Sequence, residues 1–203
     1  MKHLSRQVCL ILFLLIAGCG GSGPSIDALP EDAVILAFGD SLTHGSGVKR
    51  EQSYPAILQA ITGRQVINAG VPGEVTADGL RRLPGLLDKH QPDLLILIHG
   101  GNDMLRKKNL DVATENLRQM INLSRSRDVP VVMMGVPNPT LILSPADFYE
   151  QVAEEMEVPI EVDAIADILQ YPGNKSDTVH PNAKGYRMMA ESLQQLLQDT
   201  GAL

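Results

Sequence analysis

A run of apolar residues, Ala33 to Phe38, stops abruptly at Gly39 and is followed by Asp40 and Ser41. A short continuous apolar run that ends at a turn residue is typical of a strand buried on both faces, as in a parallel sheet. In open α/β sheets, ligands bind just beyond the carboxyl ends of such strands. We therefore expect Ser41 to lie at the edge of a cleft with its hydroxyl exposed as a nucleophile; the alternative is an ordinary serine N-cap.

Strands and helices alternate along the rest of the chain. Apolar runs predict further strands over residues 65–68, 93–98, 129–134 and 158–162. Amphipathic patterns with capping signals predict helices over residues 53–63, 76–90, 111–127, 144–157 and 181–199. Such alternation favours an α/β fold with a doubly wound parallel sheet. Glycine-bearing loops follow the first three strands, so these loops should meet over one edge of the sheet.

The helical pattern over residues 76–90 carries two signals of its own. Leucines recur along it at helical spacing, so one face should be buried. Thr76 stands at its start and is expected to cap the first turn, while Pro84 falls inside the pattern. Because proline lacks the N–H that an interior helix position donates, we expect Pro84 to kink or split the helix.

The N-terminus has the features of a bacterial lipoprotein signal peptide. Two positive charges and no acidic residue precede ten consecutive apolar residues, 8–17. This run is too short to span a bilayer as a helix, which takes about 20 residues, but it has the length of a signal-peptide core. It ends in Ile16-Ala17-Gly18-Cys19, which resembles the lipobox. By that resemblance the chain is cut before Cys19, which becomes the lipidated first residue; the alternative is a secreted protein cleaved near Gly18.

This interpretation divides the chain into a signal peptide over residues 1–18, a lipidated cysteine with a flexible linker over 19–31, and one domain over 32–203. Cys9 and Cys19 then both lie outside the domain, which excludes a disulfide, a cysteine nucleophile and a cysteine-bound metal there. The chain has 24 acidic and 17 basic residues, and the signal peptide holds two of the basic ones. The domain is therefore acidic, which argues against nucleic acid as a partner.

Polar residues in separate stretches form a candidate catalytic site. Ser41 is the candidate nucleophile, and His180 is the candidate base that takes its proton. Asp177 precedes His180 by three residues and can reach back to the other imidazole nitrogen, which fixes the tautomer and stabilises the imidazolium. The side-chain amide of Asn102 and the backbone N–H groups of Gly73 and Ser41 can donate hydrogen bonds to a developing oxyanion.

The other polar residues near these stretches point to structural roles. Asp40 and Asp103 are expected to bond loop backbone rather than to carry protons. His99 is expected to be a satisfied core histidine; lining the floor of the cleft is the alternative. Because His44, His90 and His99 lack the spacing and the companions of a metal site, no metal is expected.

The order of these motifs resembles that of the SGNH hydrolases, also called the GDSL esterase/lipase family, and the likeness covers nearly all of residues 32–199. It is greatest to the family's bacterial periplasmic members with arylesterase, thioesterase and lysophospholipase activity. The matching blocks are Gly39-Asp40-Ser41-Leu42, Gly73, Gly101-Asn102-Asp103 and Asp177-x-x-His180.

The resemblance implies a catalytic triad of Ser41, Asp177 and His180. It also implies an oxyanion hole formed by the Ser41 amide, Gly73 and Asn102.

Two stretches depart from the family pattern. The second block reads Pro72-Gly73-Glu74-Val75, where related enzymes usually have a small polar residue followed by Gly, Asp and Thr. Gly70 is an alternative oxyanion glycine, but Gly73 aligns better with the block. The segment after Val136-Pro137 is rich in proline and leucine and matches poorly, which leaves the substrate preference open.

The resemblance implies a three-layer, flavodoxin-like α/β hydrolase with about five parallel strands. We expect a serine esterase that cleaves small acyl, aryl or lysophospholipid-type esters and thioesters through an acyl-serine, without a metal or organic cofactor. It should work on the periplasmic side of the bacterial cell envelope, held to a membrane by the lipid on Cys19. The alternatives are a carbohydrate O-deacetylase and a non-catalytic envelope-binding lipoprotein; the scarcity of aromatic residues and the absence of Trp leave little for stacking on sugars.

A final expectation concerns Leu141, Ile142 and Leu143, which follow two prolines after the fourth predicted strand. Three consecutive aliphatic residues in a loop that reaches the surface are unusual unless something covers them. They either line an acyl groove beside Ser41 or pack under the helix that begins near Ser144.

Overall fold

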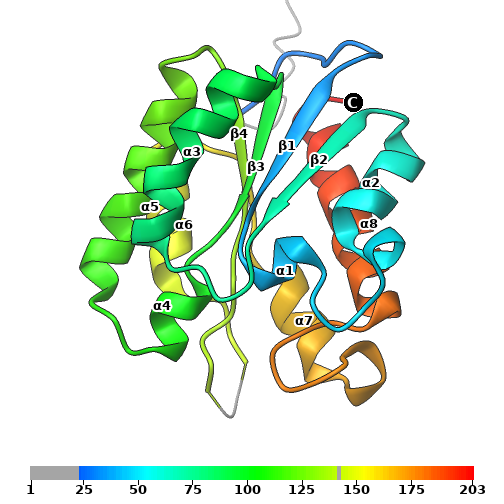
Figure 1. Cartoon of the computed structure of the whole chain (residues 1–203), viewed down its shortest axis with the longest axis vertical. Helices are drawn as coiled ribbons and strands as arrows, with labels where there is room; N and C mark the ends of the chain where they lie inside the picture. Colours follow the sequence, from blue (N-terminus) through cyan, green and yellow to red (C-terminus); the bar gives the residue numbers. More distant parts are fainter. Residues whose placement is uncertain (1–22, 141–142) are drawn as a thin grey trace, which may run out of the picture.

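The computed structural model describes residues 23–140 and 143–203. Its centre is one sheet of five parallel strands in the order β2-β1-β3-β4-β5, which lies between layers of helices (Figure 1). The strands are β1 (Val34–Gly39), β2 (Gln65–Gly70), β3 (Leu94–Ile98), β4 (Val131–Met134) and β5 (Ile160–Glu161). This confirms the predicted α/β class and number of strands, and the strand order is that of flavodoxin-like folds.

Helices cover both faces of the sheet. One layer consists of α3 (Thr76–His90), α5 (Leu110–Arg125) and α6 (Asp147–Glu155), and the other of α2 (Tyr54–Thr62), α7 (Ala164–Gln170) and α8 (Ala183–Asp199). Two short helices, α1 (Ser41–His44) and α4 (Gly101–Leu105), follow β1 and β3, and the 3-10 turns are η1 (Arg50–Gln52) and η2 (Pro172–Asn174). The predicted three-layer arrangement is confirmed; it arises because a sheet of continuously apolar strands must be covered on both faces.

The two central strands place the candidate site. Residues 35–38 of β1 and nearly all of β3 are inaccessible to solvent, which explains why both read as unbroken apolar runs. Gly39 pairs with Ile98 at the ends of these parallel strands, so the loops that carry Ser41 and Asn102 leave the sheet next to each other. Strand order reverses at this point, which is where open α/β sheets form their binding crevice.

Helix α3 differs from its prediction in two respects. It is one continuous helix although Pro84 lies inside it, because the buried side chains of Leu83 and Leu87 hold it against the core and outweigh one missing backbone hydrogen bond. Thr76 does not cap it, because its N–H and its hydroxyl both donate to the Asp103 carboxylate, at 2.8 and 2.9 Å. An aspartate from α4 therefore satisfies the start of α3.

The packed part of the chain begins earlier than the predicted boundary at Asp32. Ile26 and Leu29 are part of the hydrophobic core, and their N–H groups donate at 2.9 Å to the carbonyls of Thr200 and Ala202, just beyond the end of α8. Burial of these two apolar side chains offsets the entropy lost by ordering the segment. The predicted linker is therefore docked from Ile26 onward.

The predicted signal peptide and Cys19 lie outside the described residues. Within residues 23–140 and 143–203, no helix combines the length and the apolar character that a membrane span requires.

Candidate active site

Ser41 is the first residue of α1, directly beyond the end of β1. A Cβ atom at Gly39 would lie 2.1 Å from the Ile98 carbonyl oxygen, so only glycine lets β1 and β3 end this close together. Asp40, and not Ser41, caps α1, because its carboxylate accepts the Leu42 N–H at 3.0 Å. The Ser41 hydroxyl is therefore not used as an N-cap, the alternative that the sequence left open.

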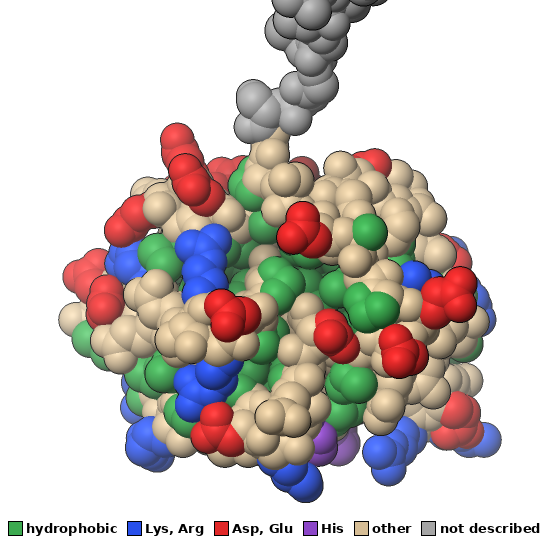
Figure 2. All heavy atoms as spheres, turned by 90° about the horizontal axis from the view of Figure 1, so that it is seen from above, with side chains coloured by type: hydrophobic (Ala, Val, Ile, Leu, Met, Phe, Trp, Pro, Cys, Tyr) green, Lys and Arg blue, Asp and Glu red, His purple; other side chains and the backbone are tan. Residues whose placement is uncertain are grey.

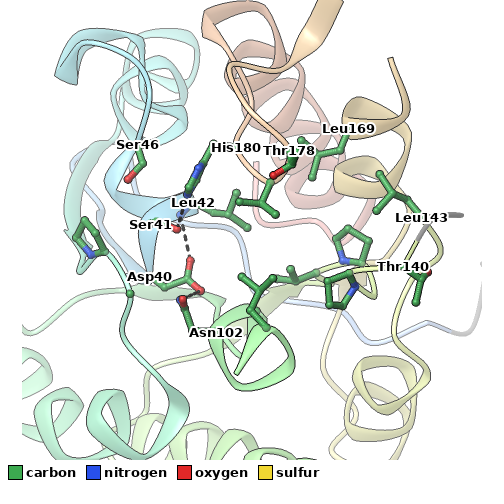
Figure 3. Close-up of a pocket in the computed structure, with 18 residues that line it drawn as sticks. Asp40, Ser41, Leu42, Ser46, Asn102, Thr140, Leu143, Leu169, Thr178 and His180 are labelled. Atoms are coloured by element: carbon green, nitrogen blue, oxygen red, sulfur yellow. Dashed lines mark hydrogen bonds between the residues drawn. The ribbon is translucent and has the colours of Figure 1, made fainter. Parts of the chain in front are cut away.

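Ser41, His180 and Asp177 form one hydrogen-bonded chain. His180 Nε2 lies 2.9 Å from Ser41 Oγ, and His180 Nδ1 lies 2.8 Å from Asp177 Oδ2; Figure 3 shows the histidine ring directed at the serine. An ionised Asp177 only accepts hydrogen bonds, so Nδ1 carries the ring proton and Nε2 has a lone pair for the serine hydroxyl. This is the arrangement in which an imidazole can take the serine proton.

Asp177 is held by its own loop as well as by the histidine. Its Oδ1 accepts the backbone N–H groups of Val179 and His180, at 2.8 and 2.9 Å. Burial by itself raises the pKa of Asp177, but these backbone bonds and the bond from the His180 ring outweigh it and lower the pKa below its usual value. The carboxylate is therefore ionised near neutral pH and orients the imidazole.

Three hydrogen-bond donors belong to residues that line the same pocket: the N–H groups of Ser41 and Gly73 and the side-chain amide of Asn102. Among the described residues, the N–H groups of Ser41 and Gly73 have no hydrogen-bond acceptor. Asn102 donates one amide hydrogen to Asp40 Oδ2 at 3.0 Å, which fixes the side-chain orientation and leaves the second hydrogen for the pocket. Gly73 has a left-handed φ of +77°, and its carbonyl accepts a bond from Arg106 at 2.8 Å, which holds the peptide that follows its N–H. The donors at Ser41, Gly73 and Asn102 can all serve an oxyanion.

The two aspartates next to the site have the structural roles predicted from sequence. Burial raises the pKa of Asp40 above its usual value, and the nearby His99 and the hydrogen bonds from Leu42 and Asn102 offset only part of this rise. Asp40 thus connects the start of α1 to the Asn102 amide. Asp103 accepts both bonds from the start of α3 and is not among the residues that line the pocket beside Ser41.

A pocket of about 520 Å³ opens beside these groups. Its wall includes Ser41, His180 and Asn102 (Figure 3). Gly73 lines it as well. Much of the remaining wall is apolar, with contributions from Leu42, Pro72, Val136, Leu143, Leu169 and Val179. A pocket of this kind suits a substrate with a polar reacting group and an apolar substituent.

The predicted acyl-groove residues are described only in part. Leu143 lines the pocket and also packs against the core, so both alternatives from the sequence apply to it. Leu141 and Ile142 lie outside the described residues.

His99 is a core histidine, as expected. Its ring is inaccessible to solvent; Nε2 lies 3.1 Å from Glu74 Oε2, and Nδ1 accepts the Gly100 N–H at 3.0 Å. Within the described part of the chain, no group of three or more His, Cys, Asp or Glu side chains is placed to hold a metal ion.

Sequence reasoning missed the contacts of Glu74 and Arg82 near the site. Arg82 forms two hydrogen bonds with the Glu74 carboxylate, at 2.9 and 2.6 Å. The only available signal was the departure at Glu74 from the usual family block. Arg82 carries no signal of its own, because a solvated arginine on a helix has the same sequence pattern.

Comparison with known proteins gives consistent matches. A profile of the GDSL-like lipase/acylhydrolase family matches residues 37–188. The chain is 32% identical over 206 aligned residues to the arylesterase of Vibrio mimicus, which covers 95% of this chain and 97% of the relative. It is 28% identical over 174 residues to the thioesterase 1/protease 1/lysophospholipase L1 of Escherichia coli K12, covering 81% and 83% of the two chains.

A solved structure supports the same assignment. The psychrotrophic esterase EstA from Pseudoalteromonas sp., solved in a form inhibited by monoethylphosphonate, superposes with a TM-score of 0.72 and 26% identity. The superposition covers 82% of this chain and all of that one. The family profile spans well over half of this chain, and the Vibrio relative aligns over nearly all of it. The protein therefore belongs to the GDSL-like lipase/acylhydrolase family.

Proposed function

We propose that this protein is a serine esterase that hydrolyses carboxylic ester and thioester bonds of small acyl, aryl or lysophospholipid-type substrates. One observation carries the proposal: an unbroken hydrogen-bonded chain runs from Asp177 through His180 to Ser41 at the wall of an apolar pocket. The relatives named as arylesterase and as thioesterase/lysophospholipase support the substrate class.

The first half of the proposed reaction acylates the serine. Ser41 Oγ attacks the carbonyl carbon while His180 Nε2 takes its proton, and negative charge develops on the carbonyl oxygen. The three donors at Ser41, Gly73 and Asn102 stabilise this oxyanion. The bond from the carbonyl carbon to the leaving oxygen or sulfur then breaks, and the imidazolium returns its proton to that atom.

The second half regenerates the enzyme. Water takes the place of the leaving alcohol or thiol, and His180 removes a proton as the water oxygen attacks the acyl-serine carbonyl. Collapse of this second tetrahedral intermediate breaks the bond to Ser41 Oγ, which recovers its proton from the imidazolium. The net reaction consumes one water and releases a carboxylic acid.

Labelling with a serine-reactive fluorophosphonate, combined with a substrate panel, tests the proposal. We expect stoichiometric labelling of Ser41 and turnover of p-nitrophenyl esters from acetate upward. The panel also contains lysophospholipid and acetylated sugars; labelling with turnover of the sugars alone favours a deacetylase. Folded protein that is not labelled at Ser41 contradicts an esterase and favours a binding lipoprotein.

Replacing Leu143 by alanine tests whether this part of the pocket holds the acyl chain. Each methylene of a buried chain contributes up to about 0.8 kcal/mol, so we expect a severalfold lower kcat/KM for octanoyl or longer esters and little change for acetyl esters. The matched control is Leu110→Ala, because Leu110 is an exposed leucine outside the pocket. Equal losses on short and long esters together with a lower Tm show instead that Leu143 acts only in the core.

We further infer that residues 1–18 are removed and that the lipid on Cys19 anchors the protein to a membrane of the bacterial envelope, on its periplasmic side. The lipobox-like Ile16-Ala17-Gly18-Cys19 at the end of a short apolar run supports this. The end of the domain at which the described residues begin carries interspersed acidic and basic side chains (Figure 2). Such a surface does not favour electrostatic docking to anionic lipid, which leaves the lipid as the anchor.

The segment that begins at Gly23 and the candidate site lie at opposite ends of the domain (Figure 1). His180 stands just before α8, whereas Ile26 is bonded just beyond its other end. This helix of 17 residues is about 25 Å long, while the five residues from Cys19 to Gly23 span at most about 18 Å. An anchored enzyme would therefore present its site away from its own membrane, to esters that arrive through the aqueous phase.

Replacing Cys19 by serine tests the anchor. The variant has no thiol to acylate, so we expect complete loss of the lipid and no cleavage by the lipoprotein peptidase, as measured by mass spectrometry of the membrane fraction. A chain that begins at Ser25 keeps the docked Ile26 and Leu29 and should retain its esterase activity without the membrane. A Cys19→Ser protein that is still acylated contradicts the lipobox interpretation.

A further inference from the structure

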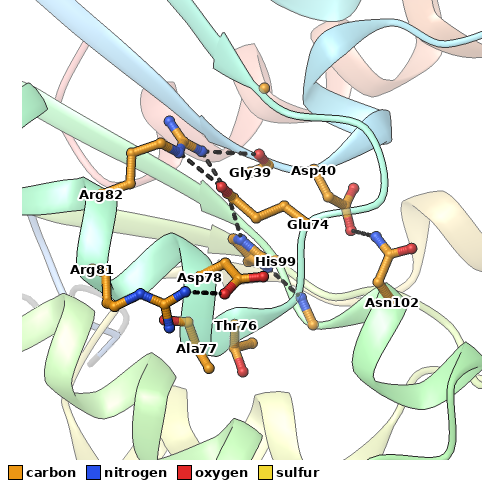
Figure 4. A network of polar contacts seen from close by, with 12 residues as sticks. Gly39, Asp40, Glu74, Thr76, Ala77, Asp78, Arg81, Arg82, His99 and Asn102 are labelled. Carbon is orange, nitrogen blue, oxygen red and sulfur yellow. Dashed lines mark hydrogen bonds and ion pairs between the residues drawn. The ribbon is translucent and has the colours of Figure 1, made fainter.

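A buried ionic cluster lies behind the candidate oxyanion hole (Figure 4). Arg82 Nε lies 2.9 Å from Glu74 Oε1, and its terminal nitrogen lies 2.6 Å from Glu74 Oε2. His99 Nε2 approaches the same Oε2 at 3.1 Å. The Glu74 side chain is only 7% exposed and that of His99 is fully buried, so these groups exchange their bonds with water for bonds to each other.

The protonation states in the cluster follow from its hydrogen bonds. The Gly100 N–H donates to His99 Nδ1 at 3.0 Å, so Nδ1 must have its lone pair free, and the ring proton on Nε2 donates to Glu74. Burial by itself raises the pKa of Glu74, but the bonds from His99 and Arg82 outweigh it and lower the pKa to about 2. Glu74 is therefore an anion at every working pH.

Each member of the cluster is connected to a different loop of the site, either through the chain or through a hydrogen bond. Glu74 directly follows Gly73 in the chain. The Arg82 guanidinium lies 4.3 Å over the Phe38 ring and reaches the Gly39 carbonyl at 3.5 Å, at the end of the strand that leads to Ser41. His99 accepts the N–H of Gly100, which precedes the helix that carries Asn102.

We propose that Glu74, held by Arg82 and His99, is a positioning residue that fixes the three oxyanion donors relative to one another. The inference rests on the proposed esterase function. Glu74 lies behind the donors and does not line the pocket, so it acts through the loops and not on the substrate. Donors must stay within roughly 0.5 Å of their productive positions, and a shared buried anion can hold three separate loops to that tolerance.

The packing around the cluster is specific to this arrangement. A Cβ atom at Gly79 would lie 2.5 Å from His99 Nε2, so α3 leaves room for the histidine only because position 79 is glycine. The Tyr149 hydroxyl donates to the His99 carbonyl at 2.8 Å and holds the backbone of the same residue. Together with Arg106, which bonds the Gly73 carbonyl, these contacts connect the cluster to the donor loops and leave it little freedom to shift.

The direct test replaces Glu74 by glutamine, which keeps the size but removes the charge and turns an N–H group toward Arg82 or His99. A displacement of the donors by up to about 1 Å can cost 10- to 100-fold in rate. We therefore expect kcat for p-nitrophenyl acetate to fall by that range while KM stays within about twofold, and the rate of Ser41 phosphonylation to fall in parallel. The measurement is made per active site, on protein whose Tm shows that it is folded.

A pair of His99 variants provides a second test if Glu74→Gln fails to fold. Glutamine can both donate to Glu74 and accept from Gly100, so His99→Gln should stay within a few fold of the wild-type kcat. Leucine can do neither, so His99→Leu should lose kcat to the same extent as Glu74→Gln. Rescue by the variant that keeps both hydrogen bonds would not be expected if His99 only filled space.

Two neighbouring arginines provide a matched control. Arg81 is exposed, and among the described residues it bonds only within its own helix, to the Asp78 carboxylate and the Ala77 carbonyl, so Arg81→Ala should leave kcat unchanged. Arg82→Ala should lower kcat as Glu74→Gln does. On an Asn102→Ala background, Glu74→Gln should cost less than it does alone, because one of the donors that it positions is already absent.

The proposal is overturned if folded Glu74→Gln keeps its kcat, if only its KM or Tm changes, or if both His99 variants behave alike. It also fails if the Glu74 and Asn102 losses multiply fully. Failure of the esterase function itself has a different signature, because the wild-type protein would then show neither turnover nor phosphonylation.

Discussion

Replacing Ser41 by alanine is expected to lower kcat by several orders of magnitude, on the order of 10⁴ to 10⁶. The variant has no nucleophile, because it lacks the hydroxyl that lies 2.9 Å from His180 Nε2 in the wild-type protein. His180→Ala should lose a similar factor, because an un-ionised serine hydroxyl is a weak nucleophile without its base. Ester hydrolysis under single-turnover conditions measures both losses.

The double variant is the more informative measurement. Because the two side chains act as one unit, Ser41→Ala/His180→Ala should be little worse than either single variant. Ser126→Ala is the matched control, since Ser126 is exposed just beyond the C-terminal end of α5, and its hydroxyl bonds only the Leu123 carbonyl and the Arg127 side chain among the described residues. Losses that multiply fully in the double variant, or substantial turnover by Ser41→Ala, would contradict the assignment of the pair.

Replacing Asn102 by alanine is expected to lower kcat by about 10² to 10³, the effect typical of one oxyanion donor, with little change in KM. The reason is that its second amide hydrogen is used fully only when charge develops on the carbonyl oxygen. The first hydrogen is donated to Asp40 Oδ2, which lies 3.0 Å from Asn102 Nδ2. This bond orients the Asn102 amide before substrate arrives. Steady-state kinetics with a small aryl ester separates the two parameters.

The control for this variant is Asn122→Ala, which removes an exposed asparagine from the last turn of α5. It should leave both parameters unchanged. If Asn102→Ala instead changes KM alone, Asn102 binds the ground-state substrate and the oxyanion depends on the two backbone amides.

The secondary structure followed from the sequence where the pattern was long and continuous. The runs that became β1 and β3 are buried on both faces, so every residue in them had to be apolar, and the pattern was unmistakable. Helix α7, Ala164–Gln170, was not predicted, because seven residues make too few turns for a helical period to stand out. The edge strand β5 has only two residues, whereas the sequence predicts a strand over residues 158–162. A strand this short has no periodic pattern of its own that could mark its ends.

Where tertiary contacts override local preference, sequence rules were wrong. Pro84 was expected to kink or split α3, yet packing of the neighbouring leucines keeps the helix continuous. Thr76 was expected to cap the same helix, but Asp103, 27 residues away in the sequence, takes that role. Both outcomes depend on what lies next to the helix in space, which its own residues do not encode.

The sequence by itself determined which residues are the candidates for the site. A nucleophile at the end of a buried strand and an aspartate three residues before a histidine are local patterns, because strand ends and short loops are specified by adjacent residues. The tertiary structure decided which groups meet. Ser41 and His180 are 139 residues apart and come into contact only through the order of the strands and the docking of α8. The Glu74–Arg82–His99 cluster likewise exists only because a loop, a helix and a strand converge at low dielectric, where an anion is stable only if such partners surround it.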